Sequence, residues 1–271
     1  MRIDVRGFEM GYEDTGGAGV PLILIHGFPL DRTIWSAQVS GLSDVARVIA
    51  PDLRGFGESS MAGGAMTIDD YATDVRALMD ALGLAKAVIG GVSMGGYVAM
   101  AFQRKFPSRV EGLVFVDTRG DADTLEGKAG RDASIATARA EGVAAIAAQM
   151  LPKMLTPAAS EPKRRALSDM MNRQTLEGVV GALAALRDRG SSTSSNAGIR
   201  VPALVVCGAE DAIIAPKEAE ALRATIPGAR LVVIPGAGHL PNYETPDAFN
   251  AAVRELLATI PVRRQAASAA A

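Results

Sequence analysis

Cysteine and histidine are scarce in this chain. Of its 271 residues only one is cysteine, Cys207, and only two are histidines, His26 and His239. A single cysteine excludes an internal disulfide framework and is compatible with the reducing cytoplasm, where we expect the protein. Two histidines are too few to make a His-rich metal site plausible. Gly55 and Gly57 are too isolated for a dinucleotide-binding motif, and no phosphate-binding loop occurs, so neither cofactor nor metal is expected.

Long apolar runs and clusters of basic residues are also missing. No stretch of about 18 apolar residues occurs, so no transmembrane helix is expected. The first 16 residues carry charges in place of the apolar region of a signal peptide, and residues 263–271 are expected to form a disordered tail. The net charge is −2, without a basic stripe, so neither nucleic acid nor a membrane is expected as a partner.

Short apolar runs rich in β-branched residues recur between longer segments with helical periodicity. Unbroken apolar strands indicate burial on both faces, which is typical of a parallel sheet covered by helices. Residues 2–5 and 8–12 add an antiparallel hairpin at one edge. The sequence therefore predicts an α/β fold with a doubly wound, mostly parallel, eight-stranded sheet. The six apolar runs are Pro21–Ile25, Ala46–Pro51, Ala85–Gly91, Glu111–Asp117, Pro202–Gly208 and Arg230–Gly236.

One interval interrupts this alternation of strands and helices. About 84 residues separate Asp117 from Pro202 without a clear strand, far more than one crossover helix requires. Alanine- and methionine-rich helical patterns fill the interval, and the last of them is expected to be the crossover helix. We therefore predict a helical cap over residues 120–175, inserted after the sixth strand between the core segments 1–119 and 176–262.

Ser93 follows a buried strand and precedes a helical run, and it is flanked by Gly91 and Gly95. The G-x-S-x-G pattern between a strand and a helix predicts a nucleophile elbow, a tight strained turn that exposes the serine hydroxyl above the sheet. Side chains at the two glycine positions are expected to collide with the neighbouring backbone. The N-terminus of the following helix points its positive end at the same place, which favours an oxyanion.

A serine hydroxyl needs an adjacent base to act as a nucleophile, and the elbow architecture places that base on a loop after the last strand. His239 occupies such a loop and is the predicted base. His26 closes the first parallel strand, and we expect it to hydrogen-bond backbone groups there.

A carboxylate must orient the imidazole of the base and stabilise its cation. Asp211 ends the strand before the one that leads to His239, which gives the chain order Ser, Asp, His. Asp211 is therefore the preferred candidate. Its neighbour Glu210 and Asp117, at the end of the sixth strand, stay open as alternatives.

Two backbone N–H groups are expected to form an oxyanion hole. One belongs to Met94, the residue directly after the serine. The other is assigned to Phe28, in the loop after the first parallel strand, since the next residue, Pro29, has no N–H.

With these residues in view, the chain resembles the α/β-hydrolase superfamily over nearly its full length. The matching segments are HGFPLDRTIW, PDLRGFGESS, GGVSMGGYVAM, GAEDAIIAP and GAGHLPNYETPDAFNAAV. Within the superfamily it looks most like small carboxylesterases and 3-oxoadipate enol-lactonases. The resemblance implies a triad of Ser93, Asp211 and His239, with Phe28 and Met94 as oxyanion donors.

The expected activity is hydrolysis of a small or medium carboxylic ester through an acyl-enzyme, by a monomer or a homo-oligomer. The same three residues also suit a lactonase, a cofactor-free perhydrolase or a carbon–carbon hydrolase. A ligand receptor built on the hydrolase fold is the alternative outside enzymes.

Several other side chains have two possible roles. Asp52 and Arg54 are expected to shape the loop after the fourth strand, with substrate binding as the alternative. Trp35 is expected to pack in the core, with a place in a pocket wall as the alternative. Four methionines of the expected cap either line an apolar acyl pocket or serve ordinary packing. These are Met150, Met154, Met170 and Met171.

Overall fold

A computed structural model describes residues 1–62, 64 and 66–261, and the tail predicted at 263–271 lies outside this range. The chain forms one eight-stranded sheet with the spatial order β1-β2-β4-β3-β5-β6-β7-β8. The pairs β1–β2 and β2–β4 are antiparallel, and all the others are parallel, as the sequence predicts. The strands are β1 (Arg2–Val5), β2 (Phe8–Asp14), β3 (Val20–Ile25), β4 (Ala46–Pro51), β5 (Ala87–Val92), β6 (Val110–Val116), β7 (Ala203–Gly208) and β8 (Arg230–Ile234).

Helices cover both faces of the sheet, and alternate residues of each central strand enter two separate apolar clusters. Ile23 and Ile25 of β3 belong to the cluster under α2, α3 and α9, whereas Leu22 and Leu24 pack with α1 and α11. This explains why the central strands read as unbroken apolar runs. The helices are α1 (Ser36–Leu42), α2 (Ile68–Ala81), α3 (Met94–Lys105), α9 (Pro216–Thr225) and α11 (Pro246–Leu257).

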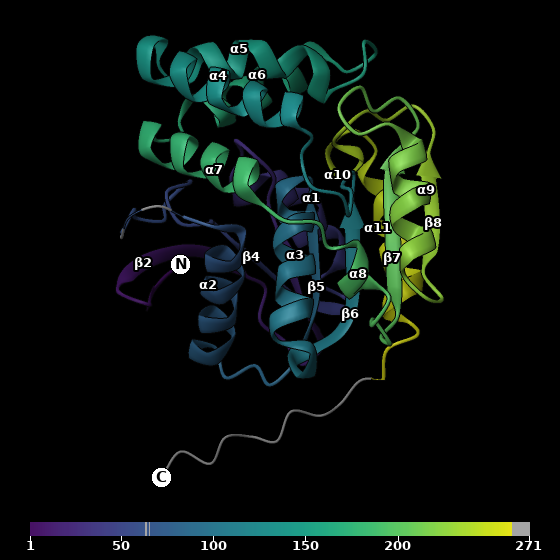
Figure 1. Ribbon diagram of the computed structural model, residues 1–271. Coiled ribbons are helices and arrows are strands. Elements are labelled where there is room, and N and C mark those ends of the chain that lie inside the picture. Colours follow the sequence, from purple (N-terminus) through teal and green to yellow (C-terminus); the bar gives the residue numbers. More distant parts are fainter. Residues whose placement is uncertain (63, 65, 262–271) are drawn as a thin grey trace.

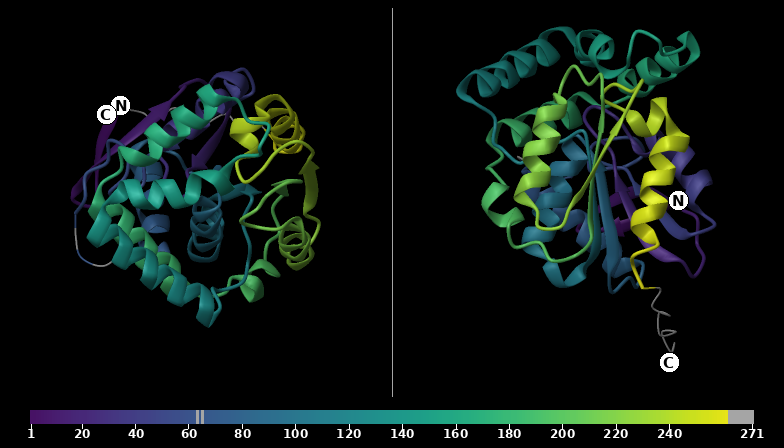
Figure 2. Two further views of the ribbon diagram at one scale, coloured as in Figure 1. Left: turned by 90° about the horizontal axis from the view of Figure 1, so that it is seen from above. Right: turned by 90° about the vertical axis from the view of Figure 1, so that its right-hand side faces the viewer.

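A layer of helices between β6 and β7 lies over one end of the sheet (Figures 1 and 2). It contains α4 (Leu125–Glu141), α5 (Val143–Met154), α6 (Glu161–Asn172) and α7 (Leu176–Asp188), followed by the short α8 (Thr193–Asn196). We call α4 to α7 the cap. The helix α7 packs along α4. The division of the chain at residue 175, which assigns the following helix to the core, stays a prediction.

The two ends of the cap segment are bound to each other. Arg189, just after α7, donates a hydrogen bond of 2.9 Å from Nη2 to the carboxylate of Asp123, just before α4. Arg119 and Arg131 also pair with Asp123, which is buried.

No helix of the described residues is long and apolar enough to cross a membrane.

The register of the parallel strands brings their carboxyl ends into line. The loops that follow β3, β5, β6, β7 and β8 therefore leave the sheet at the same edge, below the cap, where parallel sheets of this kind bind ligands. The residues paired near that edge are Ile25 with Gly91, Val92 with Val116, Val116 with Val206, and Gly208 with Ile234.

Candidate active site

Ser93 lies at the tip of the turn between β5 and α3. Its φ of 53° and ψ of −114° place a residue with a Cβ in a region that L-amino acids rarely adopt. The Ser93 N–H donates to the carbonyl of Val116 at 2.8 Å, and its carbonyl accepts from the Thr118 hydroxyl at 2.9 Å. Contacts from β6 and the loop after it thus hold the strained backbone in place.

The two glycines of the motif are required by close backbone contacts. A Cβ on Gly95 would lie 2.1 Å from the carbonyl oxygen of Ile25 in β3, and a Cβ on Gly91 would lie 2.2 Å from the carbonyl carbon of Gly95. Neither position has room for a side chain, because the obstructing atoms are backbone. The collisions expected from the sequence are therefore confirmed.

Asp211 and His239 meet beneath the cap. His239 Nδ1 lies 2.8 Å from Asp211 Oδ2, and both side chains are buried. Asp211 Oδ1 accepts the N–H groups of Ile213 at 2.7 Å and Ile214 at 3.0 Å. Burial by itself raises the pKa of Asp211, but the hydrogen bond and charge of His239, with smaller contributions from Asp117 and the Ile214 N–H, outweigh it, and the pKa is lowered. Asp211 is therefore ionised and accepts the hydrogen bond from His239. Glu210, the neighbouring acid that the sequence left open as an alternative, is exposed.

The loops that carry Asp211 and His239 are joined along their backbones. The N–H of Glu210 donates to the carbonyl of Ala237 at 2.9 Å. A Cβ on Gly208 would lie 2.0 Å from the carbonyl oxygen of Gly238, so the histidine loop passes directly over the end of β7. Asp211 and His239 are therefore positioned as one unit.

Asp117, the other acid considered from the sequence, lies in the same cluster. It is fully buried, has a φ of 40°, and accepts the Gly208 N–H at Oδ1 over 3.0 Å. One ligand-type atom each of Asp117, Asp211 and His239 lie within 4.8 Å of one another. The hydrogen bond of the imidazole nevertheless goes to Asp211. The expectation that no metal takes part stays a prediction.

The loop after β3 passes beside the serine. A Cβ on Gly27 would lie 3.3 Å from the Cβ of Ser93. Phe28 is buried, and its peptide bond to Pro29 is cis. Among the residues that the structure describes, neither the Phe28 N–H nor the Met94 N–H donates a hydrogen bond. Their role as oxyanion donors stays a prediction.

His26 contacts the backbone, as the sequence analysis expects. Its Nδ1 lies 2.8 Å from the carbonyl oxygen of Gly27, and its Nε2 accepts the N–H of Leu53 at 2.9 Å. These contacts require a neutral imidazole with the proton on Nδ1. Burial lowers its pKa, although the charge of Asp52 opposes the shift. His26 thus fastens the loop after β3 to the loop after β4.

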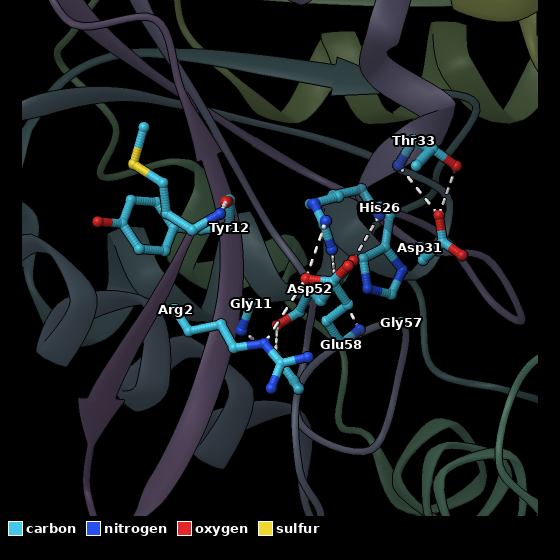
Figure 3. A network of polar contacts seen from close by, with 12 residues as sticks. Arg2, Gly11, Tyr12, His26, Asp31, Thr33, Asp52, Gly57 and Glu58 are labelled. Atoms are coloured by element: carbon cyan, nitrogen blue, oxygen red, sulfur yellow. Dashed lines mark hydrogen bonds and ion pairs between the residues drawn. The ribbon is translucent and has the colours of Figure 1, made fainter.

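Asp52 shapes the loop after β4, which confirms the role expected for it. Its carboxylate accepts the N–H of Arg32 at 2.7 Å and of Glu58 at 2.9 Å, and it pairs with the Arg32 guanidinium. A Cβ on Gly57 would collide with it at 2.3 Å. Figure 3 shows this network beside His26 and next to the hydrogen bonds between Asp31 and Thr33.

The cap is fastened to the loop after β3. The Asp31 carboxylate accepts from Arg173 at 2.7 and 2.8 Å and from the side-chain amide of Gln174 at 2.9 Å. Burial would raise the pKa of Asp31, but the hydrogen bonds from Arg173 and Thr33 dominate and lower it to about 2. The turn between α6 and α7 is thereby tied to the segment that carries Phe28.

A second attachment joins the cap to the histidine loop. Glu244 of α10 (Pro241–Glu244) accepts the N–H and the hydroxyl of Thr156 at 2.8 Å each, and the N–H of Gly238 at 2.7 Å. Lys163 of α6 donates to the carbonyl oxygens of Tyr243 and Glu244. Sequence reasoning missed both attachments, because the partners are about 80 to 140 residues apart and carry no local signal.

A family model described as the α/β-hydrolase fold matches residues 20–246. The chain belongs to this family. An esterase from Thermogutta terrifontis, solved with malate bound, superposes with a TM-score of 0.92 and 42% identity, covering 96% of this chain and 98% of that one. The enol-lactonase from Burkholderia xenovorans LB400 gives a TM-score of 0.89 and 31% identity, covering 95% and 100%.

A curated relative from Pseudomonas putida, the dihydrolipoyllysine-residue acetyltransferase component of an acetoin cleaving system, is 34% identical over 252 residues. The match covers 91% of this chain but only 64% of the relative's length. Together, the family match and the solved neighbours identify this α/β-hydrolase as one of the small esterase and lactonase type, as the sequence motifs predict.

Trp35 and the methionines of the expected cap pack in the interior, and of these residues only Met150 is partly exposed. Trp35 has no exposed surface and packs on Phe249 with the ring centroids 5.9 Å apart, in agreement with its expected core role. The cap methionines all pack in apolar clusters. A role of these methionines in lining an acyl pocket stays a prediction. A hydrogen bond between the Ser93 hydroxyl and His239 also stays a prediction.

Proposed function

We propose that this α/β-hydrolase cleaves small to medium, largely apolar carboxylic esters through an acyl-enzyme on Ser93. The observation that carries the proposal is the buried 2.8 Å contact between Asp211 and His239, at the edge of the sheet where β5 presents Ser93 on a strained turn. A nucleophile, a base and a group that orients the base are the three parts that acyl transfer needs.

In the first half of the reaction, His239 takes the proton of the Ser93 hydroxyl as its oxygen attacks the ester carbonyl. The hydrogen bond between Nδ1 and Asp211 fixes the tautomer that leaves Nε2 free to accept that proton. The charge of Asp211 then stabilises the imidazolium. The imidazolium returns the proton to the departing alcohol, and the acyl group stays on the serine.

The tetrahedral oxygen is stabilised by the N–H groups of Phe28 and Met94. Each such donor typically contributes about 2.7–4 kcal/mol in the transition state. Met94 is the first residue of α3, so its N–H has no partner within the helix and lies at the positive end of the helix dipole. In the second half of the reaction, His239 activates water, which releases the acid.

A lactone is the second candidate substrate class. The solved enol-lactonase is 31% identical to this chain, and the match covers 95% of this chain, which supports a lactone as substrate. A lactone reacts through the same acyl-enzyme, but its alcohol stays attached to the acyl group. Product analysis after incubation with matched esters and lactones of equal acyl length separates the two.

The experiment that tests the proposal compares the wild type with Ser93→Ala on p-nitrophenyl esters of increasing acyl length. We expect release of p-nitrophenol by the wild type and loss of at least about a thousandfold in kcat for the variant. A fluorophosphonate probe should label the wild type alone. Full activity in Ser93→Ala would contradict the proposal. A wild type that binds esters without hydrolysis or labelling would identify a receptor instead.

A further inference from the structure

Two buried carboxyl groups lie side by side at the acid end of the active site, and the mechanism above uses only one of them. Asp117 follows β6 and Asp211 follows β7, and one carboxylate oxygen of each lies within 4.8 Å of the other. Two carboxylates this close in a buried site cannot both stay ionised, because each charge destabilises the other and neither is hydrated. One proton is therefore shared by the pair.

The hydrogen-bond donors around the pair determine which group keeps the charge. Asp211 accepts three hydrogen bonds, from His239 and from the N–H groups of Ile213 and Ile214. Asp117 accepts one, from the N–H of Gly208 at Oδ1, and its Oδ2 is buried without a donor among the described residues. An oxygen without a donor is where a proton is best placed, because a protonated carboxyl donates a hydrogen bond in place of accepting one.

The other groups around Asp117 also favour its neutral form. Burial raises the pKa of Asp117 well above its usual value, and the charges of Asp211 and then Glu244 raise it further, against the Gly208 N–H. Cys207 of β7 adds no charge, since burial raises the pKa of its thiol to about 12.

We propose that Asp117 is a positioning residue, a neutral carboxylic acid whose Oδ2–H donates a hydrogen bond to the Asp211 carboxylate. This inference rests on the proposed function for its catalytic meaning. Asp117 holds Asp211 in the orientation that meets His239, and it does so without adding a second negative charge. A second charge would stabilise the imidazolium and keep the base protonated at higher pH, where it cannot accept the proton of Ser93.

The decisive variant is Asp117→Asn, because an amide N–H₂ donates the same hydrogen bond and is neutral at every pH. We expect the acid limb of the kcat/KM profile to keep its midpoint in this variant, with kcat/KM within about threefold of the wild type. If Asp117 is ionised in the wild type, the midpoint of the acid limb is expected to change. The substitution then removes a charge beside the imidazole, and the limb moves to lower pH by more than about half a unit. That shift would overturn the proposal.

A second variant, Asp117→Leu, has similar size but no donor. We expect kcat/KM to fall by about tenfold and the acid limb to move to higher pH, since Asp211 then accepts no hydrogen bond from this side. An unchanged profile in a folded Asp117→Leu variant would contradict a positioning role. Glu210→Gln is the matched control, since it removes an exposed carboxylate next to Asp211, and it should leave the profile unchanged.

An infrared measurement tests the proton directly and does not depend on turnover. The difference spectrum between Ser93→Ala and the double variant Ser93→Ala with Asp117→Asn, at neutral pH, should contain the C=O stretch of one protonated carboxyl group. Its absence would overturn the proposal even if Asp117→Leu does not fold. Both proteins lack the Ser93 hydroxyl, so the result does not depend on whether the wild type hydrolyses esters. A failure of the proposal on Asp117 can therefore be distinguished from a failure of the proposed ester hydrolysis.

Discussion

Asp211 and His239 are joined by a 2.8 Å contact although 28 residues separate them in the sequence. The strands β7 and β8 bring the two residues to the same edge of the sheet, and the backbone bond between Glu210 and Ala237 ties their loops together. The sheet and the loops that follow its strands therefore position the pair.

Replacing Asp211 by asparagine should disable catalysis and leave the fold intact. An amide can donate to Nδ1, which favours the wrong tautomer, and it carries no charge to stabilise the imidazolium. We expect kcat for a p-nitrophenyl ester to fall by about 10⁴-fold near neutral pH. Glu210→Gln, one residue away and exposed, is the control and should keep wild-type kcat. Equal losses in both variants would argue against the assignment of the acid.

Gly95→Ala should destabilise the protein strongly, because the added Cβ would meet the backbone of β3 at 2.1 Å. A cost of about 3 kcal/mol in the free energy of unfolding is expected for such overpacking. Gly130→Ala is the matched control. Gly130 lies within α4 with no atom within 4 Å of an added Cβ, so alanine there should stabilise by about 0.5–1 kcal/mol. Urea denaturation of the two variants checks both signs, and a Gly95→Ala variant as stable as the wild type would contradict the packing argument.

The attachment between Asp31 and Arg173 should make stability depend on pH in the acid range. A folded pKa of about 2, below the ordinary value of about 3.9, contributes stability that is present above pH 4 and is lost as the pH falls towards 2. Arg173→Gln should cost about 1 kcal/mol at pH 7, since Arg173 is half exposed and solvent screens part of the interaction.

The difference between this variant and the wild type should shrink as the pH falls from 4 towards 2, as measured by chemical denaturation. Arg165→Gln serves as the control and should have no effect, since Arg165 is an exposed arginine of α6, the helix that precedes Arg173, and takes part in no described ion pair. A loss that is the same at pH 2 and pH 7 would show that Arg173 acts without Asp31.

His26 should lower the stability of the protein below neutral pH. Burial lowers the pKa of His26 in the folded protein. Below about pH 6.5 the unfolded chain therefore binds a proton at His26 that the native protein does not bind. The contribution is complete above pH 6.5 and declines as the pH falls, by up to about 1.4 kcal/mol per pH unit. His26→Gln should be less stable overall, but its free energy of unfolding should fall less steeply between pH 6.5 and 5. Parallel slopes for the two proteins would exclude this account.

The local parts of the site were predictable because short-range chemistry defines them. A buried strand, a G-x-S-x-G turn and a helix follow one another in the sequence, so the position of Ser93 needs no tertiary information. The histidine that meets Asp211 was predictable because the chain has only two histidines, and His26 directly follows a strand and contacts backbone groups.

The choice between Asp117 and Asp211 was open in the sequence for a physical reason. Both acids follow neighbouring strands, and only the three-dimensional arrangement decides which of them meets Nδ1 of His239. The attachments of the cap at Asp31 and Glu244 were invisible for the same reason. A carboxylate in a loop is usually solvated, and nothing near it in the sequence identifies a partner on a distant helix.

The ion pair between Asp123 and Arg189 closes the base of the segment that carries α4 to α7. A segment whose two ends are bound to each other is a natural unit for recombination, provided that its partners for Asp31 and Glu244 are kept. Exchanging this contiguous block among relatives replaces the helices that lie over the carboxyl ends of the strands and leaves the strands themselves unaltered. Laboratory evolution of new acyl preferences therefore has a defined pair of crossover points in this chain.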